Sequence, residues 1–260
     1  MATLSLYSSR LYRRSPVLLQ NAAISFKGLL SRVTRRSRRF SKVLAQIRAR
    51  ETLTVEGIRD FQCRELRFII EHATRNVPYY RKLFEGCGLS ESMIQSPDDL
   101  KKLPCLEKET VRTQPLQFVP TNLKKWLLIR AGTSGSTGTP LQLYRTLDSV
   151  IYEHGYVWRQ FAWAGGSLGN RIVALRGDVV VPSSHRTPPF WRHNLAENTL
   201  IMSSYHIAED TIPLYLAAIR DFQPTLIYSY PSAVYPLAEY IVRKKLAGDF
   251  IVDPGFWTRQ

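Results

Sequence analysis

The stretch Thr133-Ser134-Gly135-Ser136-Thr137-Gly138-Thr139-Pro140 decides the fold of this 260-residue chain. An apolar run from Trp126 to Ile129 precedes it, and alternating residues from Leu141 to Tyr144 follow it, which predicts a strand, a tight loop and a second strand. The loop combines glycines with hydroxyl side chains, so several N–H and O–H groups can converge on one anion. We therefore expect a phosphate-binding loop. A flexible Gly/Ser linker is the alternative, and the flanking strands argue against it.

The residues around this loop distinguish it from the Walker type of phosphate loop. That type needs Gly-x-x-x-x-Gly-Lys followed by Ser or Thr, and no lysine follows Gly138 here. The loop resembles the nucleotide phosphate loop of the adenylate-forming superfamily, which includes acyl-CoA synthetases, luciferases and peptide-synthetase adenylation domains. Many of these continue with Pro-Lys-Gly, whereas this chain continues with Pro140-Leu141-Gln142. The departure resembles the phenylacetate–CoA ligase branch and its CapK-type relatives of capsular polysaccharide biosynthesis.

Composition indicates a globular protein with a sizeable core. Apolar residues make up 44% of the chain and aromatic residues 11%. No apolar run reaches the roughly 18 residues that a membrane-spanning helix needs, so we expect no transmembrane segment. The three cysteines are widely spaced, which favours reduced thiols and a cytoplasmic protein. The five histidines show no metal-ligand spacing, so we expect no zinc site.

The net charge of +15 belongs mainly to the N-terminal segment. Residues 1–50 hold 12 Lys or Arg and no acid, which leaves 24 basic and 21 acidic residues in the remainder. A transit peptide and a basic arm for anionic lipid or nucleic acid are two interpretations of this composition. The third is a resemblance to the CapK-type lead-in, which has Pro-x-x-x-Gln-Asn, then Ser-x-x-Gly, then a basic patch. Here these appear as Pro16 to Asn21, Ser25 to Gly28 and the arginines from Arg35 to Arg39.

We favour the third interpretation and expect residues 1–53 to form a basic lead-in that belongs to the folded protein. The segment supplies apolar residues that we expect to be buried: Leu18, Leu19, Ile24, Phe26, Leu29 and Leu30.

Residues 54–125 are expected to be helical. Thr54 can cap a helix that ends before Pro78, and Ser96-Pro97-Asp98-Asp99 is a strong helix start. The order of Asn76-Val77-Pro78-Tyr79-Tyr80, the Asp-Leu helix and Leu103-Pro104-Cys105-Leu106-Glu107-Lys108 resembles the opening of the same family.

Residues 126–260 alternate between strand and helix patterns, which predicts an α/β body with βαβ units. We expect helices at 146–165, 207–222 and 232–246, strands at 171–175, 199–205 and 225–229, and a proline-rich loop at 177–195.

Two further groups are candidate substrate-binding residues. The segment Tyr230-Pro231-Ser232 follows a strand and resembles the turn that lines the substrate side of the family's cleft, although proline and serine also start helices. His206 follows another strand, where some superfamily members place a residue at the acyl pocket. A satisfied structural histidine is the alternative for that position.

The resemblance implies a fold, a reaction and a set of ligands. The fold is the N-terminal part of the large domain of an adenylate-forming enzyme. The reaction joins a small carboxylate to ATP, releases pyrophosphate and passes the acyl group of the acyl-adenylate to a thiol or amine. The resemblance implies ATP and magnesium as ligands and no specific nucleic acid as partner. It does not predict an oligomeric state. The phosphate-binding residues implied are Thr133, Ser134, Gly135, Ser136, Thr137 and Gly138.

Later parts of the family pattern do not follow in this sequence. We find no Tyr-Gly-x-Thr/Ser-Glu segment for adenine and magnesium, no ribose aspartate, no hinge and no C-terminal lid domain. We therefore expect a truncated N-terminal fragment that lacks its magnesium ligand and does not catalyse adenylation alone. The alternative is a non-catalytic interaction protein whose basic N-terminal arm binds an anionic polymer or membrane surface.

Overall fold

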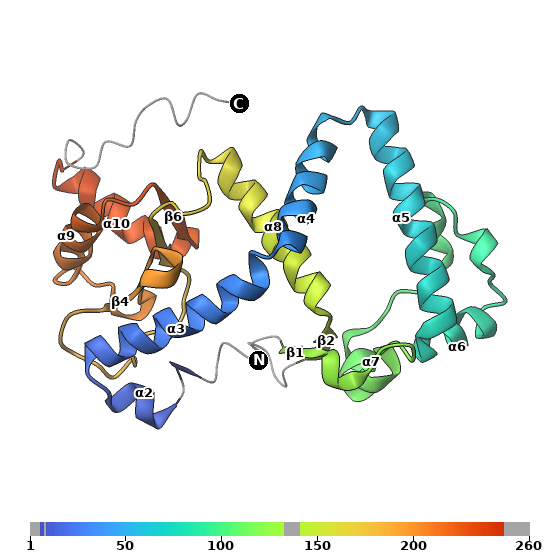
Figure 1. Ribbon diagram of the computed structural model, residues 1–260, viewed down its shortest axis with the longest axis horizontal. Helices are drawn as coiled ribbons and strands as arrows, with labels where there is room; N and C mark the ends of the chain where they lie inside the picture. The colour runs from blue at the N-terminus through green and yellow to red at the C-terminus, as the bar shows by residue number, and fades with distance from the viewer. Residues whose placement is uncertain (1–5, 8, 133–140, 247–260) are drawn as a thin grey trace. The chain divides into compact units, whose positions relative to one another are not determined.

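A computed structural model of the protein describes residues 6–7, 9–132 and 141–246 (Figure 1). Contacts group them into two compact units, one from Ala45 to Tyr152 and the other from the residues before 45 and after 152. The fold is mixed α/β with a mainly helical lead-in, as the sequence predicts. The bounds of the units fall within two helices, α4 (Arg38–Ala49) and α8 (Leu147–Trp163).

The first unit is built on helix α5 (Val55–Asn76), which begins and ends where the sequence predicts. The Thr54 hydroxyl accepts a hydrogen bond from the Gly57 N–H at 3.1 Å, which caps the first turn. Pro78 stops the helix and starts α6. The other elements are α6 (Pro78–Gly86), α7 (Lys108–Thr113) and 3₁₀ turns at Arg50–Thr52, Glu91–Met93, Pro97–Lys102, Pro115–Phe118 and Lys125–Leu127.

The helix start predicted at Ser96 is capped as expected, but the turns that follow are 3₁₀ and not α-helical. The Asp99 carboxylate accepts hydrogen bonds from the Ser96 N–H at 3.0 Å and the Lys102 ammonium at 2.6 Å. The hydrogen bond from the Lys102 ammonium is the largest of the causes that hold the pKa of Asp99 well below its usual range. These contacts close a short 3₁₀ segment, Pro97–Lys102. The sequence therefore predicts the position of the cap correctly, but not the type of helix that follows it.

Strands β1 (Ile129–Gly132) and β2 (Gln142–Arg145) form an antiparallel hairpin around the quoted loop. Gly132 lies opposite Gln142, so the two ends of the loop are paired. The predicted first strand at 126–129 is displaced toward the loop. Trp126 and Leu127 are exposed and belong to a 3₁₀ turn, so the apolar run does not mark a buried strand.

The second unit contains a four-stranded sheet in the order β4-β5-β3-β6. Strands β5 and β6 both run parallel to β3, and α9 links β5 to β6, so the predicted βαβ unit is present. The core formed by the sheet with α9 and α10 is centred on Val173, Leu200, Tyr215 and Leu237. The strands are β3 (Ile172–Leu175), β4 (Trp191–Asn194), β5 (Thr199–Met202) and β6 (Leu226–Ser229), and the helices are α2 (Arg10–Arg14), α3 (Val17–Arg35), α9 (Ile212–Phe222) and α10 (Pro231–Arg243).

Three predictions in this unit need correction. The strand predicted at 199–205 ends at Met202, and a 3₁₀ turn follows at Ser204–His206. The proline-rich segment 177–195 is not all loop, because β4 forms within it as an edge strand antiparallel to β5. The helix predicted from 207 begins only at Ile212, because the Thr211 hydroxyl accepts from the Ala208 N–H at 2.9 Å and closes a turn first. Pro213 then lies in the first turn of α9, where it needs no N–H partner.

Helix α3 lies along the edge strand β4, and the lead-in motif supplies the contacts (Figure 1). The Asn21 carboxamide oxygen accepts from the His193 N–H at 3.0 Å, and the Ser25 hydroxyl accepts from the Leu195 N–H at 3.0 Å. A Cβ on Gly28 would lie 2.4 Å from the Asn194 side chain, so glycine permits the close approach. The polar residues of the motif thus satisfy groups at the free edge of β4 that a further strand would otherwise pair.

The apolar residues of α3 do not behave as expected. Ile24 is buried against Val180 and Ile201, which confirms that one prediction. The other five predicted core residues are half or more exposed: Leu18, Leu19, Phe26, Leu29 and Leu30. They are exposed because the polar face of α3 is the face that packs against the sheet.

Candidate functional site

The carboxyl ends of β3, β5 and β6 meet at one edge of the sheet, where open α/β sheets bind their ligands. Three segments leave the strands there. Arg176 and Gly177 follow β3, Ser203 to His206 follow β5, and Tyr230 lies between β6 and α10. All three segments belong to the second unit, so this edge is a single candidate site.

The segments after β3 and β6 are tied to each other by the strand ends. The Ser229 hydroxyl donates to the Leu175 carbonyl at 2.9 Å, and the Tyr230 N–H donates to the same carbonyl at 3.3 Å. This fixes the first turn of α10 beside the end of β3. Tyr230, Pro231 and Ser232 are exposed on that turn, with Pro231 at its first position.

His206 ends a 3₁₀ turn (Ser204–His206) after β5 and is 8% exposed. Its Nδ1 lies 2.8 Å from the Ser203 hydroxyl, and its ring stacks on Phe190 with centroids 4.8 Å apart. Its Nε2 is buried and has no hydrogen bond of acceptable geometry to the described residues. Burial lowers the pKa of His206, while backbone groups of Pro182 and His185 oppose the shift. Burial therefore disfavours the charged form of this ring, and its Nε2 is the ring nitrogen without a well-aligned hydrogen bond to the described residues.

Tyrosine hydroxyls hold the backbone around His206. Tyr215, which is fully buried on α9, donates to the Ser203 carbonyl at 2.6 Å. Tyr205 donates to the Gly177 carbonyl at 3.1 Å. Gly177 has φ of +79°, which L side chains rarely adopt, so glycine is required where the chain turns away from β3. The segments after β3 and β5 are thereby joined.

Arg176 is a site residue that sequence reasoning missed. Its guanidinium stacks on the Tyr228 ring at 4.3 Å and donates to the Tyr230 hydroxyl at 3.5 Å. Its Nε is buried without a hydrogen-bond partner among the described residues. The available signal was its position directly after a predicted parallel strand. A positive charge with a spare N–H at this edge can bind a carboxylate or phosphate oxygen.

The structure thus brings Tyr230, Pro231 and Ser232 to the same sheet edge as His206. The residues Thr133, Ser134, Gly135, Ser136, Thr137 and Gly138 lie outside the described part of the chain, and only the hairpin that carries them is described. Over the described ranges 6–7, 9–132 and 141–246, no group of three or more His, Cys, Asp or Glu side chains could hold a metal ion. In the same ranges, no helix is long and apolar enough to cross a membrane.

Comparison with curated proteins gives relatives over most of the chain. Protein CapK of Staphylococcus aureus is 24% identical over 242 residues, which are 92% of this chain and 52% of CapK. The phenylacetate-coenzyme A ligase of Escherichia coli K12 is 30% identical over 203 residues, which are 76% of this chain and 44% of that enzyme. That of Pseudomonas putida is 30% identical over 198 residues. The chain spans about half the length of the curated relatives it matches. No protein-family model matches it.

Solved structures show a similar fold. A crystal structure of 2-hydroxyisobutyryl-CoA ligase in the postadenylation state, in complex with R3-HIB-AMP, has a TM-score of 0.53 at 16% identity. The match covers 75% of this chain and 41% of that one. The same ligase with 2-HIB-AMP and CoA, in the thioesterification state, has a TM-score of 0.50 at 19% identity, with the same coverage.

The fold and these relatives define the class as adenylate-forming ligases. Within that class, the chain belongs to the family of CapK and the phenylacetate-CoA ligases, as the loop and the lead-in motif predict.

Proposed function

We propose that this chain supplies the nucleotide-binding and carboxylate-binding side of a CapK-type adenylate-forming ligase. In this reaction a small carboxylate attacks the α-phosphate of ATP, pyrophosphate leaves, and the acyl group of the acyl-adenylate passes to a thiol or amine. No general base is needed, because the carboxylate is already ionised near neutral pH. A magnesium ion would neutralise phosphate charge, and we assign no ligand for it. We place the reaction in the cytoplasm, since all three cysteines are free and Cys87 and Cys105 are exposed.

The observation that carries the proposal is the pair of unsatisfied buried nitrogens, Arg176 Nε and His206 Nε2, at the carboxyl edge of adjacent strands. A buried polar atom without a protein partner is costly, so a ligand that supplies a partner at this edge would be stabilised. An anionic or carbonyl oxygen would satisfy Arg176, and either a donor or an acceptor would suit the neutral imidazole. Tyr230, Pro231 and Ser232 would line the acyl side of the same edge.

The phosphate loop would bind the β- and γ-phosphates of ATP through Ser134 to Gly138, with Thr133 ordering its entry. Support comes from the pairing of Gly132 with Gln142, which holds the loop ends together at a fixed spacing. Glycines and hydroxyls then offer donors to the departing pyrophosphate, which is where charge develops.

Calorimetric titration with ATP tests the loop. The Ser136→Ala, Thr137→Ala double variant should bind ATP more weakly than the unchanged chain. Identical isotherms for the two proteins would contradict the assignment. Binding is the appropriate measurement, because the assignment concerns the contacts that the loop makes with the phosphates.

Titration with phenylacetate tests the carboxyl edge. Arg176→Met should weaken binding by roughly 10- to 150-fold, the equivalent of a lost charge-assisted hydrogen bond of about 1.5–3 kcal/mol. Arg171→Met is the matched control, because Arg171 precedes the same strand at its opposite end and donates to Gln223 at 3.4 Å. Equal losses in the two variants would show a general charge effect and overturn the role of Arg176.

A further inference from the structure

The outward face of α3 is a continuous apolar stripe. At 100° per residue, its six large apolar side chains fall within about 120° of the helix surface. All are between 50% and 80% exposed: Leu18, Leu19, Phe26, Leu29, Leu30 and Val33. We call them the outer stripe. An apolar stripe of this length on an exposed helix indicates an interaction surface for a protein, a ligand or a membrane.

The helix cannot rotate to bury the outer stripe, because its other face is fixed. The Gln20 carboxamide accepts from the Arg192 guanidinium, and Arg192 is 1% exposed. Asn21 and Ser25 accept backbone N–H groups from β4 and the turn that follows it. Gly28 lies against Asn194. The polar face is committed to the sheet edge, so the outer stripe faces away from it.

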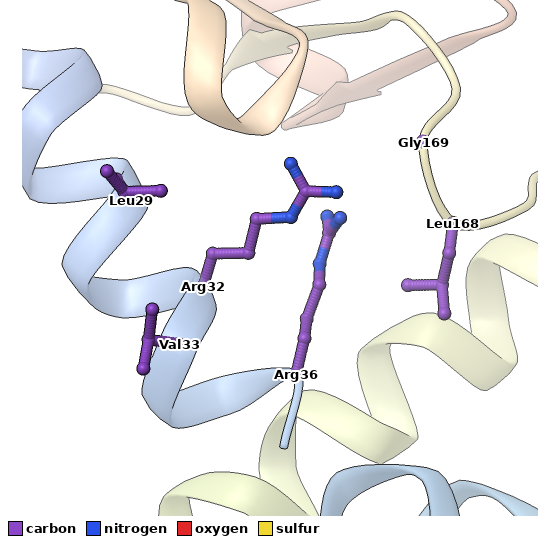
Figure 2. A pocket seen from close by; sticks show the side chains of 6 residues that line it. All are labelled: Leu29, Arg32, Val33, Arg36, Leu168 and Gly169. Carbon is purple, nitrogen blue, oxygen red and sulfur yellow. The ribbon is translucent and has the colours of Figure 1, made fainter. Parts of the chain in front are cut away.

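Arginines at one end of the outer stripe define a pocket. Figure 2 shows the guanidinium groups of Arg32 and Arg36 side by side, pointing into the space between α3 and the segment with Leu168. Leu29, Val33 and Leu168 form the apolar part of the lining, and the pocket volume is about 510 Å³. The site therefore offers positive charge beside an apolar wall that includes two members of the outer stripe.

The charge in this pocket is only partly compensated by the protein. Arg36 donates to the Glu197 carboxylate at 2.6 Å, and Arg32 donates to the Ala196 carbonyl at 3.1 Å. The Arg36 Nε is buried without a partner among the described residues. Burial lowers the pKa of Arg36, the Glu197 carboxylate opposes that shift, and the neighbouring Arg32 lowers the pKa further. A second anion in this pocket would be stabilised by both guanidinium groups.

We propose that the outer stripe of α3 binds the surface of an anionic lipid bilayer, and that Arg32 and Arg36 take the phosphate of a lipid headgroup. Charge complementarity selects this partner, because residues 3–44, which belong to the same unit as α3, contain 10 basic side chains and no acid. A helix of 19 residues with this pattern lies flat in the interface, with its apolar side chains among the acyl chains. Each basic residue near an anionic surface strengthens the attraction to it.

Other partners fit the same face less well. A second copy of the chain would bring two acid-free basic segments together, and these repel each other. A nucleic acid would use the arginines but leave the apolar outer stripe in water, because phosphate contacts dominate such binding.

Flotation with lipid vesicles tests the proposal. The 260-residue protein should float with vesicles of phosphatidylcholine containing phosphatidylglycerol and not with phosphatidylcholine alone, and 0.5 M salt should weaken binding. Leu18→Asp, Phe26→Asp should lower the partition coefficient at least tenfold. Arg32→Gln should lower it about fivefold, which is the fold-change for about 1 kcal/mol. The matched control is Tyr235→Asp, Val242→Asp on α10, where both side chains are similarly exposed, and it should bind as the unchanged protein does.

Several outcomes would overturn the proposal. Equal binding by the outer-stripe variant and the α10 control would show that α3 is not the contact. Flotation with neither vesicle type would exclude the bilayer. Self-association that disappears in the outer-stripe variant would identify a second copy as the partner. Titration with inorganic phosphate distinguishes a site for free phosphate from a site for a lipid headgroup. Phosphate binding that is lost in Arg32→Gln but is not affected by vesicles would assign the pocket to free phosphate alone. Because the substituted residues are exposed, unchanged thermal unfolding checks that each variant folds.

Discussion

The two edges of the four-stranded sheet are protected in different ways. At the β4 edge, side chains of α3 take the place of a further strand, and Asn21 and Ser25 accept the N–H groups of His193 and Leu195. At the β6 edge, the described strands provide a partner on one side only, which is β3. Ile227 in β6 is 43% exposed.

The comparison shows that a helix can protect an edge strand when its polar side chains accept the strand's free N–H groups. The docked face of α3 carries Asn21, Ser25 and Gly28 at intervals of three or four residues, so one helix face follows the strand. An edge closed in this way cannot pair with another chain, whereas an edge with one partner can. Substitutions at the two edges should therefore have different consequences.

The largest effect is expected from Gln20→Leu at the β4 edge. Gln20 accepts from the buried Arg192 guanidinium and donates to the Tyr12 and Ser15 carbonyls, both at 2.9 Å. Leucine leaves the buried cation short of an acceptor, which should lower the free energy of unfolding by about 3 kcal/mol. Urea denaturation measures the change.

Gln46→Leu is the control, because Gln46 is an exposed helical glutamine whose contact is a 3.5 Å hydrogen bond from Tyr152. It should change stability by less than about 0.5 kcal/mol. If the two variants unfold at the same urea concentration, Arg192 does not depend on Gln20 and α3 does not close the edge as described.

The next effect is expected at Gly28. Gly28→Ala should lose about 1–2 kcal/mol, because the new Cβ would displace the Asn194 carboxamide, which accepts from the Glu197 N–H at 3.2 Å. At Gly57 in α5 a Cβ would meet ordinary contacts at 3.5 Å, so Gly57→Ala should instead gain about 0.5–1 kcal/mol. Thermal unfolding of both variants checks the sign. A gain at both positions would show that α3 does not approach β4 closely.

The β4 edge also shows what sequence reasoning can reach. Helix α5 was predicted because its signals are local: a threonine cap, apolar spacing and a terminal proline. Strand β4 was missed, because its side chains Arg192, His193 and Asn194 are polar and resemble a loop. Their partners on α3 lie about 170 positions earlier, beyond any local pattern. The lead-in motif singled out Asn21, Ser25 and Gly28 by resemblance without giving this reason.

The candidate site also contains residues that the sequence predicts and one that it does not. His206 and Tyr230 were singled out because each follows a predicted strand, and the structure brings both to the carboxyl edge. Arg176 follows a strand too, but an arginine after a strand is ordinary until the fold shows its unpartnered Nε. The expected burial of the α3 leucines was wrong, because amphipathic spacing indicates an apolar face and cannot show which face docks.

A smaller effect is expected from pH. Because burial lowers the pKa of His206 below the ordinary 6.5, the unfolded chain takes up a proton before the folded chain does as pH falls. Stability should therefore be full above about pH 6.5 and decrease below it, with His206 contributing less than about 1.4 kcal/mol per pH unit. His193, whose pKa burial also lowers, contributes in the same direction.

Urea denaturation between pH 5.5 and 8 measures this slope, and His206→Gln should reduce it without removing it, since His193 remains. A slope that is unchanged in His206→Gln would show that His206 titrates as an exposed histidine, and its buried nitrogen would then need another explanation.

The smallest effect on stability, within about 0.5 kcal/mol, is expected from Ile227→Lys at the β6 edge. The side chain is half exposed, so lysine can keep its charge in water, while a charge on an edge strand opposes pairing with another chain. We expect Ile227→Lys to reduce concentration-dependent self-association, measured by light scattering. Leu195→Lys is the control at the other edge, where Leu195 is exposed but its N–H already donates to Ser25. It should leave self-association unchanged, because α3 closes that edge. An equal reduction by both lysines would show that net charge alone governs association, and the difference between the two edges would then have no consequence in solution.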